Sequence, residues 1–346
     1  MNKLHPNFRL NGFALTKEDM HCVAYDLIKE GLEYEQEVGL FLLEWFDESP
    51  EITLKTSGTT GAPKEITVSK QAMIHSALAT GAFFDLYPKD KILCCMPVNF
   101  IAGKMMFVRA FVLGLELDFV QPSLSPLLKI EKEYNFCAMT PMQVENSLDQ
   151  LHQIKKIIIG GAKVSSDLEE KLLPLSTVCY ETYASTETLT HIAARKMGCE
   201  YFELLPDISI TTDSRGCLVI DAPRISAQTI TTNDLVEIKS ENEFKWLGRI
   251  DNVINSGGLK LFPETIEAKL TSKIDKPFFV GGISDSVLGE KLVLVVESSP
   301  FELQNDIFDS LDKYEKPKKV FFVPKFTLTE SGKIKRKDIL AQFQDS

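Results

Sequence analysis

The spacing of apolar residues changes along the chain and predicts different secondary structure in successive regions. Within residues 1–50, apolar positions recur every three to four residues in KEDMHCVAYDLIKEG and again in EVGLFLLEWFDE, which predicts amphipathic helical structure. The segments EITL and EITV, on either side of residues 55–64, instead alternate β-branched and polar residues. This alternation is typical of two short strands joined by a tight connection.

From about residue 65 to residue 182, short apolar runs alternate with longer segments of helical periodicity. The runs that predict strands are KILCCMPV, LELDFVQ, YNFCAMT, KKIIIGG and STVCYETY. The segments that predict helices between them are SKQAMIHSALATGAFFDLY, GKMMFVRAFVLGL, PMQVENSLDQLHQ and SSDLEEKLLPL. This alternation predicts the α/β class, with a mostly parallel sheet covered by helices.

After residue 190 the pattern changes twice. Residues 190–247 contain only short strand-like segments, namely HIAARK, ISITT, GCLVID, QTITT, DLVEIK and FKWLG, which predict an antiparallel β subdomain. The segments after GRIDNVINSGG predict a small α+β unit that ends in a basic turn and helix, TESGKIKRKDILAQF. We therefore expect a large N-terminal α/β domain at residues 1–248, including the β subdomain, and a small mobile C-terminal α+β domain at residues 249–346.

Composition and charge narrow the classes of partner. The 346 residues carry a formal net charge of −11, so a polyanion such as DNA would be repelled and nucleic-acid binding is not expected. No apolar run reaches membrane-spanning length, and MNKLHPNFRL lacks the apolar core of a signal peptide. The seven cysteines show no spacing that indicates zinc or a disulfide framework, which favours a reducing, cytoplasmic location.

The connection between EITL and EITV is rich in hydroxyl groups and glycine, with Lys64 as the cation at its turn. Glycine allows positive φ, and hydroxyls with unscreened backbone N–H groups form a donor surface for phosphate oxygens. The common P-loop places four residues between its glycines, whereas two separate Gly58 from Gly61. Taken by itself, a segment rich in Gly, Ser and Thr is usually a flexible hairpin loop. The candidate phosphate-binding residues are Thr56, Ser57, Gly58, Thr59, Thr60, Gly61 and Lys64.

Five motifs in a fixed order resemble those of the acyl-adenylate-forming superfamily, which includes acyl-CoA synthetases, carrier-protein adenylation domains and luciferases. TSGTTGAPKEI is similar to its phosphate loop, YASTE to its Tyr-Gly-x-Thr-Glu motif, and TNDLVEI to its Thr-Gly-Asp segment. GRIDNVINSGGLKLFPETIE resembles the hinge motif and SGKIKRKDI the C-terminal lysine motif. The resemblance spans residues 56–338 and implies that the first loop binds the β- and γ-phosphates of ATP.

The resemblance also assigns the rest of the nucleotide site. Glu187 would bind Mg²⁺, a hard cation that prefers oxygen ligands, Thr186 would donate to the α-phosphate, and Asp234 would accept from the ribose hydroxyls. Further expected ATP-binding residues are Gly160, Gly161, Ala162, Tyr183, Ala184 and Arg249. Without the motifs, Glu187 is compatible with a surface glutamate, Asp234 with a turn residue, and the segment at Gly160 with an ordinary strand-to-helix turn.

The C-terminal motifs imply further roles. Asp251 matches the hinge position, about which the small domain would turn between two half-reactions. Lys333 would contact both the substrate carboxylate and the α-phosphate, although without its motif it is one more charge in a basic tail. Gly257 and Gly258 would let the backbone approach the pantetheine arm of CoA. The expected catalytic residues are therefore Lys333, Thr186 and Glu187.

The chain departs from the family pattern at several positions. Ala184 stands where the family has glycine, Asn252 where it has a second acidic hinge residue, and Glu65 where the phosphate loop usually ends in glycine. Only 55 residues precede the phosphate loop, fewer than is usual in the family. An N-terminal subdomain is therefore expected to be reduced or missing.

The segment MPVNFIAGKMMFVRAFVLGL bears on the acid substrate. Arg109 interrupts a helix that is otherwise apolar from Met105 to Leu115, and a buried arginine seldom lacks an anion. It would bind a second substrate carboxylate in a bidentate pair, unless it snorkels to the surface or pairs with a protein carboxylate. The segment resembles short o-succinylbenzoate–CoA ligases, with Phe100, preceded by Asn99, where they have histidine. The expected substrate-binding residues are Arg109, Asn99 and Phe100.

Together these observations predict an acid–thiol ligase of menaquinone biosynthesis that activates o-succinylbenzoate as an acyl-adenylate and transfers it to CoA. Mg²⁺, ATP and CoA would be required. Another aryl- or fatty-acyl-CoA ligase, a carrier-loading adenylation enzyme and a non-catalytic nucleotide-binding interaction protein remain open as alternatives. The partners would be small molecules rather than nucleic acid or membrane, and the sequence leaves a homodimer open.

Overall fold

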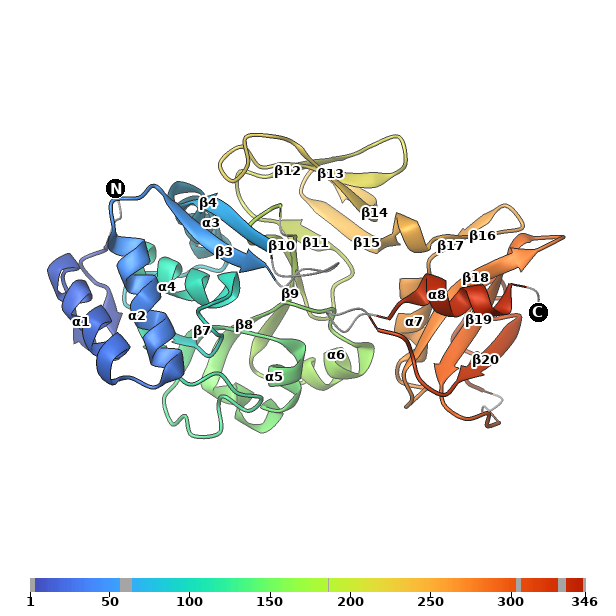
Figure 1. Cartoon of the computed structure of the whole chain (residues 1–346), viewed down its shortest axis with the longest axis horizontal. Helices are drawn as coiled ribbons and strands as arrows, with labels where there is room; N and C mark the ends of the chain where they lie inside the picture. The colour runs from blue at the N-terminus through green and yellow to red at the C-terminus, as the bar shows by residue number, and fades with distance from the viewer. Residues whose placement is uncertain (1–3, 57–63, 186, 303–305, 329–333, 345–346) are drawn as a thin grey trace.

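The computed structural model describes residues 4–56, 64–185, 187–302, 306–328 and 334–344 (Figure 1). Its large sheet contains thirteen strands in the order β12-β13-β14-β15-β11-β10-β9-β8-β7-β5-β6-β1-β2. A small five-stranded sheet is formed by later residues, and β3 pairs only with β4. The thirteen-stranded sheet and the five-stranded sheet occupy opposite sides of the molecule in Figure 1. The predicted α/β class is confirmed.

The centre of the large sheet is parallel and buried on both faces. Its strands, in their order across the sheet, are β6 (Glu116–Phe119), β5 (Lys91–Cys94), β7 (Tyr134–Met139), β8 (Ile154–Ile159) and β9 (Val178–Ala184). Their near-continuous apolar sequences are typical of parallel strands that are covered by helices on both faces. At one edge, β1 (Arg9–Leu10) pairs parallel to β6 and antiparallel to β2 (Phe13–Ala14).

Alternate residues of the parallel strands contribute to two separate cores. Ile92 and Phe136 pack with α3 (Lys70–Phe83) and α4 (Ile101–Leu113). Leu93 and Cys137 point to the other face, where they belong to the core that also contains residues of α5 (Pro141–Glu145) and α6 (Ser166–Leu172). This follows from the period of two residues in a strand. The arrangement leaves the ends of the strands, rather than their faces, open for a ligand.

The predicted N-terminal helices form a helical hairpin against α4. They are α1 (Lys17–Glu30), in which Thr16 and Asp19 form a capping box, and α2 (Glu33–Phe46). Two ion pairs fix the hairpin to the α/β core: Lys104 Nζ lies 3.0 Å from a carboxylate oxygen of Glu44, and Lys70 Nζ lies 2.6 Å from one of Asp47. Both lysines are buried, so the hairpin is an integral part of this domain.

The antiparallel strands predicted after residue 190 are present, and they extend the large sheet. β10 (His191–Lys196) pairs antiparallel with β9, and the large sheet continues through β11 to β15. The bounds are β11 (Phe202–Leu204), β12 (Ser209–Thr212), β13 (Cys217–Asp221), β14 (Ile230–Ser240) and β15 (Glu243–Arg249). QTITT and DLVEIK were predicted as two strands, but the last three residues of QTITT and all of DLVEIK lie in the single strand β14. Its neighbours β13 and β15 hold the backbone extended across Asn233 and Asp234, and bulges absorb the irregularity.

The helix predicted over residues 141–153 is also interrupted. It forms α5 and then a 3₁₀ segment, η1 (Leu148–Gln153). The side chain of Asn146 donates to the carbonyl of Met142, and Ser147 has φ −128°, outside the helical range. An asparagine side chain competes in this way with the backbone bonds of a helix. No helix in the described part of the chain is long and apolar enough to cross a membrane.

The chain passes from the large sheet to the small one through a 3₁₀ segment, η2 (Ile250–Asn252). The small sheet contains β16 (Ile254–Ser256), β17 (Leu259–Leu261), β18 (Phe278–Asp285), β19 (Gly289–Glu297) and β20 (Lys319–Val323). α7 (Pro263–Leu270), α8 (Arg336–Leu340) and η3 (Ala341–Phe343) accompany it, and its cores share no residue with those of the large sheet. The change of sheet coincides with the predicted boundary at residue 249, whereas independent movement of this unit stays a prediction.

Candidate active site

The carboxyl ends of the five parallel strands lie along one edge of the large sheet, which is where ligands bind in open α/β sheets. β8 and β9 are neighbours in that sheet, with Ile159 paired to Glu181. Residues 160–162 follow β8 directly, and Tyr183 and Ala184 end β9. The structure thus brings together two segments that the sequence predicts to bind the nucleotide.

The first of these segments packs closely against β9. A Cβ atom at Gly160 would lie 2.8 Å from the hydroxyl oxygen of Thr182, which itself donates to the carbonyl of Ile159 at 3.1 Å. Gly161 has φ +85°, a conformation that favours glycine. The two glycines therefore let this loop follow the end of β9 closely, and Gly161 and Ala162 are exposed beyond it.

The predicted ribose-binding aspartate lies in a cluster assembled from three strands. Tyr183 donates its hydroxyl to Asp234 Oδ2 at 2.6 Å. Asp234 on β14 is paired with Arg249 on β15, whose Nε lies 3.6 Å from Asp234 Oδ1. Burial and the negative charge of Asp234 raise the pKa of Tyr183, so its hydroxyl stays protonated as a donor. Asp234 retains acceptor capacity for a ligand, because a carboxylate accepts several hydrogen bonds.

The turn after β9 is fixed by its own side chains. The hydroxyl of Thr188 accepts from Ser185 N–H at 2.9 Å, and Thr188 N–H donates to the Ser185 hydroxyl at 3.3 Å. Leu189 has φ +64°, which marks a sharp change of direction into β10. Glu187 lies exposed in this turn, beside the strand end. Its position is compatible with the predicted role as a Mg²⁺ ligand.

Several predicted residues lie outside the part of the chain that the structure describes. They are Ser57, Gly58, Thr59, Thr60, Gly61, Thr186 and Lys333. For Thr56 and Lys64 the backbone pairing alone is described: they face each other where β3 (Glu51–Thr56) ends and β4 (Lys64–Ser69) begins, at the connected end of the hairpin. The predicted strands on either side of the phosphate loop are confirmed, and the roles of the loop residues stay predictions.

The predicted hinge segment is in contact with the cluster of Tyr183, Asp234 and Arg249. Asp251 is exposed, and its Oδ2 lies 3.8 Å from Arg249 and accepts a hydrogen bond from Asn233 at 3.4 Å. Asn252 donates its amide to the carboxylate of Glu264 on α7. An acidic residue at position 252, as in the family pattern, would place two carboxylates together, so the asparagine suits its partner in this chain.

Gly257 and Gly258 have a local explanation that is independent of any ligand. They have φ +58° and +83° and form the two-residue turn between β16 and β17. A two-residue hairpin of this kind needs positive φ at both central positions, which glycine adopts without strain. Both residues are exposed. Their predicted contact with CoA stays a prediction.

Arg109 is buried in α4 with no carboxylate partner among the described residues. Its side chain is 2% exposed, its Nε has no hydrogen-bond partner, and one terminal nitrogen lies 3.6 Å from Met106 Sδ. Burial lowers the pKa of Arg109 to about 10. Helical side chains lean toward the N-terminus of their helix, and α4 begins at the carboxyl end of β5. The guanidinium therefore leans toward the strand ends.

A cleft of about 410 Å³ opens at the carboxyl ends of β5 and β6. Cys94, which lies close enough to Arg109 for their charges to interact, lines it together with Asn99 and with apolar residues such as Met96 and Phe119. Glu33 and Glu37 also line the cleft, whereas Arg109 lies behind its wall. Phe100 is 45% exposed and does not line this cleft. The structure thus places Asn99, but not Phe100, in its wall.

His191 was not singled out from the sequence. It is buried at the start of β10, opposite Ala184, and its Nε2 lies 3.3 Å from the hydroxyl of Thr80. Burial lowers the pKa of His191 well below its ordinary value of 6.5, and the nearby charge of Arg109 acts in the same direction. Its place could not be predicted from the sequence, because Arg109 and Thr80 lie far from it along the chain.

Comparison with known proteins identifies the class of this chain. A family model described as AMP-binding enzyme matches residues 49–221, and the chain belongs to the AMP-binding enzyme family. The predicted membership in the acyl-adenylate-forming superfamily is confirmed. The solved structure of an acyl-CoA synthetase (AMP-forming)/AMP-acid ligase II-like protein from Dyadobacter fermentans is 34% identical, with a TM-score of 0.64, over 93% of this chain and 98% of that one.

Two further similarities concern one activity. A 2-succinylbenzoate–CoA ligase of Listeria monocytogenes is 27% identical over 334 residues, covering 85% of this chain and 71% of that protein. The structure of o-succinylbenzoate coenzyme A synthetase from Bacillus subtilis, in complex with ATP and magnesium ion, superposes with a TM-score of 0.71 at 19% identity. It covers 93% of this chain and 82% of the Bacillus chain, and it shows that the fold is shared.

Proposed function

We propose that this protein is an ATP-dependent acid–thiol ligase that converts o-succinylbenzoate into o-succinylbenzoyl-CoA. Membership in the AMP-binding enzyme family supports adenylate formation. The likeness to the 2-succinylbenzoate–CoA ligase of Listeria monocytogenes supports the acid and the thiol. The observation that carries the choice of acid is Arg109, a buried guanidinium without a carboxylate partner among the described residues.

In the first half-reaction, an oxygen of the succinyl carboxylate attacks the α-phosphorus of ATP. The bond to the bridging oxygen breaks, and pyrophosphate leaves with that electron pair. Asp234 would accept from the ribose hydroxyls, and residues 160–162 would support the adenine. Thr186 and Lys333 would stabilise charge on the α-phosphate, because positioning and electrostatic stabilisation dominate this chemistry. Mg²⁺, when bound, would neutralise phosphate charge, and the exposed carboxylate of Glu187 fits an oxygen-preferring cation.

The order of the strands relates the nucleotide segments to the cleft. β8 is separated from β5 by β7 alone. Neighbouring strands lie about 4.8 Å apart, so the ends of β8 and β5 are roughly 10 Å apart. An acyl chain that begins at the α-phosphate can therefore cross the end of β7 and bring its ring toward Cys94 and Arg109. The ring carboxylate would then neutralise the buried guanidinium.

In the second half-reaction, the thiolate of CoA attacks the acyl carbonyl carbon. A carbon–sulfur bond forms, the carbon–oxygen bond to the phosphate breaks, and AMP leaves with the electron pair. The small unit would turn about Asp251 between the two steps, which would move Lys333 away. The turn at Gly257 and Gly258 would then face the pantetheine arm.

An ATP–pyrophosphate exchange assay with a panel of acids tests the proposal. Exchange with o-succinylbenzoate, followed by formation of its thioester on addition of CoA, is the expected result. Preference for a different acid would identify another aryl- or fatty-acyl-CoA ligase. Adenylation without transfer to CoA would favour a carrier-loading enzyme. Binding of ATP without exchange for any acid would indicate a nucleotide-binding interaction protein.

A further inference from the structure

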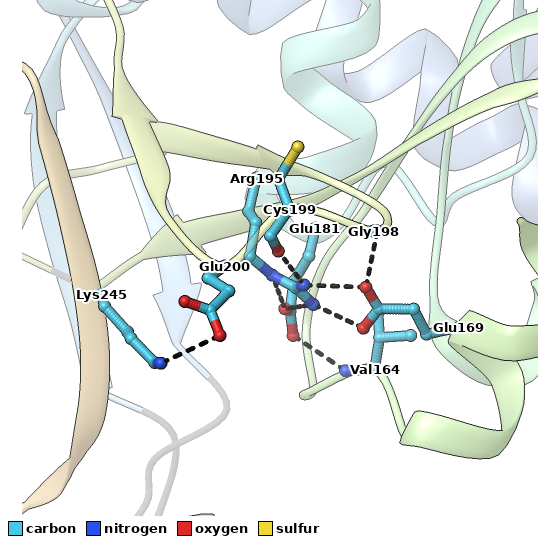
Figure 2. A network of polar contacts seen from close by, with 8 residues as sticks. All are labelled: Val164, Glu169, Glu181, Arg195, Gly198, Cys199, Glu200 and Lys245. Carbon is cyan, nitrogen blue, oxygen red and sulfur yellow. Dashed lines mark hydrogen bonds and ion pairs between the residues drawn. The ribbon is translucent and has the colours of Figure 1, made fainter.

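A nearly buried polar network lies between β10, β9 and α6 (Figure 2). Its centre is Arg195 on β10, whose side chain is 13% exposed. The two terminal nitrogens of Arg195 donate to the two carboxylate oxygens of Glu169 on α6, at 2.9 and 3.0 Å. Nε and Nη2 donate to Glu181 Oε2 on β9, at 3.2 and 2.8 Å. One guanidinium therefore joins carboxylates from two elements.

Glu181 extends this network to the loop after β8. Its Oε1 accepts a hydrogen bond from the backbone N–H of Val164 at 2.9 Å, while Oε2 faces Arg195. Val164 lies two residues after Ala162, and Glu181 lies two residues before Tyr183. A single carboxylate thus sets the distance between the two segments that are proposed to hold the nucleotide.

The groups of the network are matched in charge and in hydrogen bonding. Burial tends to lower the pKa of Arg195, but the carboxylates of Glu169 and Glu181 raise it overall. Burial likewise tends to raise the pKa of Glu169, but its bonds from Arg195 and from Gly198 N–H lower it overall. Arg195 and Glu169 therefore stay charged at neutral pH, and a satisfied buried network favours one arrangement of its members.

We propose that Arg195 is a positioning residue for nucleotide binding, which acts through Glu181 to hold residues 160–164 against β9. It is not a catalytic residue, since it bonds to Glu169, Glu181 and the carbonyl of Cys199. Without the guanidinium, two carboxylates would face each other, and Glu181 would lose the geometry that fixes Val164. The inference rests on the proposed function, because that function makes ATP the ligand.

Arg195→Lys is the primary test, because it keeps the charge and removes the planar fork that bonds both carboxylates at once. The dissociation constants for ATP and AMP, measured by titration calorimetry, are expected to rise roughly tenfold. The KM for ATP should rise with them, while the KM for CoA stays unchanged. The control is Lys245→Ala. Lys245 is also a cation, and its Nζ lies 3.4 Å from a carboxylate oxygen of Glu200, but in the described structure it makes no bond to residues 160–164. This variant should bind ATP as the wild type does.

Two further variants separate positioning from stability. Glu181→Gln cannot both accept from Val164 and accept from Arg195, so it should weaken ATP binding, and its effect should not add to that of Arg195→Lys. Glu169→Gln weakens the bond to α6 and leaves the bond between Glu181 and Val164 intact. It should lower the Tm and leave the dissociation constant for ATP nearly unchanged.

The outcomes distinguish failure of the inference from failure of the proposed function. If the wild-type protein binds neither ATP nor AMP, the proposed function is wrong. If the wild type binds them and both Arg195→Lys and Glu181→Gln bind them equally well, only the inference is wrong, and the network is purely structural. If Lys245→Ala raises the dissociation constant for ATP as much as Arg195→Lys does, the inference is also wrong, because the loss of any nearby positive charge would then explain the effect.

Discussion

At the scale of single residues, the buried cations of the N-terminal half are the most informative groups. Lys70 and Lys104 are 2% and 7% exposed, and each has a carboxylate within 3.0 Å. Arg109 lies on the same helix as Lys104 and is also buried, but among the described residues its hydrogen-bond partner is the thioether of Met106 and its Nε has none. An unpaired buried charge is unfavourable, so a site of this kind is suited to a ligand that brings the missing anion.

Arg109→Met removes the charge with little change in volume. The free energy of unfolding of the free protein should be retained or increased, because a buried unpaired cation is lost. The KM for o-succinylbenzoate should rise about ten- to a hundredfold, as expected for a lost bond to a charged group. Steady-state kinetics with an analogue that lacks the ring carboxylate provides the check: the variant should use it no worse than the wild type does. If the two losses add instead, Arg109 binds something else.

His191 makes stability depend on pH. Burial lowers its pKa well below 6.5, so the folded protein keeps the ring neutral while the unfolded chain takes up a proton below about pH 6.5. The unfolded state then binds more protons than the folded state. The contribution of neutral His191 to the free energy of unfolding is therefore fully present above this pH, and below it the free energy of unfolding falls by about 1.4 kcal/mol per pH unit. Urea unfolding of the wild type and of His191→Gln between pH 5.5 and 7 measures the difference. Parallel curves for the two proteins would contradict this assignment.

At the scale of elements, the contact between the loop after β8 and the strand β9 determines which residues are tolerated. A methyl group at Gly160 would meet the hydroxyl of Thr182 at 2.8 Å and force it away from the carbonyl of Ile159. Gly160→Ala should therefore lose about 1 kcal/mol of stability, the value of one hydrogen bond, and weaken ATP binding several-fold. Thermal unfolding and nucleotide titration test both effects. Adding Thr182→Ala removes the clash and should restore much of the ATP affinity; no recovery would place the cause elsewhere.

The sequence predicted those elements whose cause is local. Runs such as KKIIIGG and YNFCAMT predicted the parallel strands, and the segment at Gly160 and the motif YASTE predicted residues that follow the ends of β8 and β9. β10 follows β9 directly and pairs with it, whereas the insertion of β11 beside β15 joins residues far apart along the chain, so the continuous sheet was not predicted. The bond between Tyr183 and Asp234 joins residues 51 positions apart and follows only from the strand order. The hydrogen bonds of Arg195 to Glu169 and Glu181 could not be predicted for the same reason.

At the scale of the whole molecule, few polar contacts join the two sheet-bearing units in the described structure. The hydroxyl of Ser166 on α6 donates to the carbonyl of Ala268 on α7 at 3.0 Å. The hydroxyl of Thr265 donates to the carbonyl of Leu247 on β15 at 3.1 Å. Hydrogen bonds of this kind contribute about 1 kcal/mol each, which is small enough for a second arrangement to be reached during the reaction.

Two independent changes should therefore disfavour the arrangement seen here. Asp251→Pro acts on the hinge, because the residue before a proline avoids helical backbone and Ile250 belongs to the 3₁₀ segment. The double variant Ser166→Ala/Thr265→Val removes both hydroxyl bonds and leaves the hinge unchanged. Losing about 2 kcal/mol of contact would shift the population of this arrangement by more than tenfold. We expect both proteins to change the ratio of adenylation rate to thioester-forming rate, and to change it in the same direction. Pyrophosphate release and thioester formation from preformed acyl-adenylate, measured separately, give that ratio. A wild-type ratio in both proteins would show that rotation about Asp251 does not separate the two half-reactions.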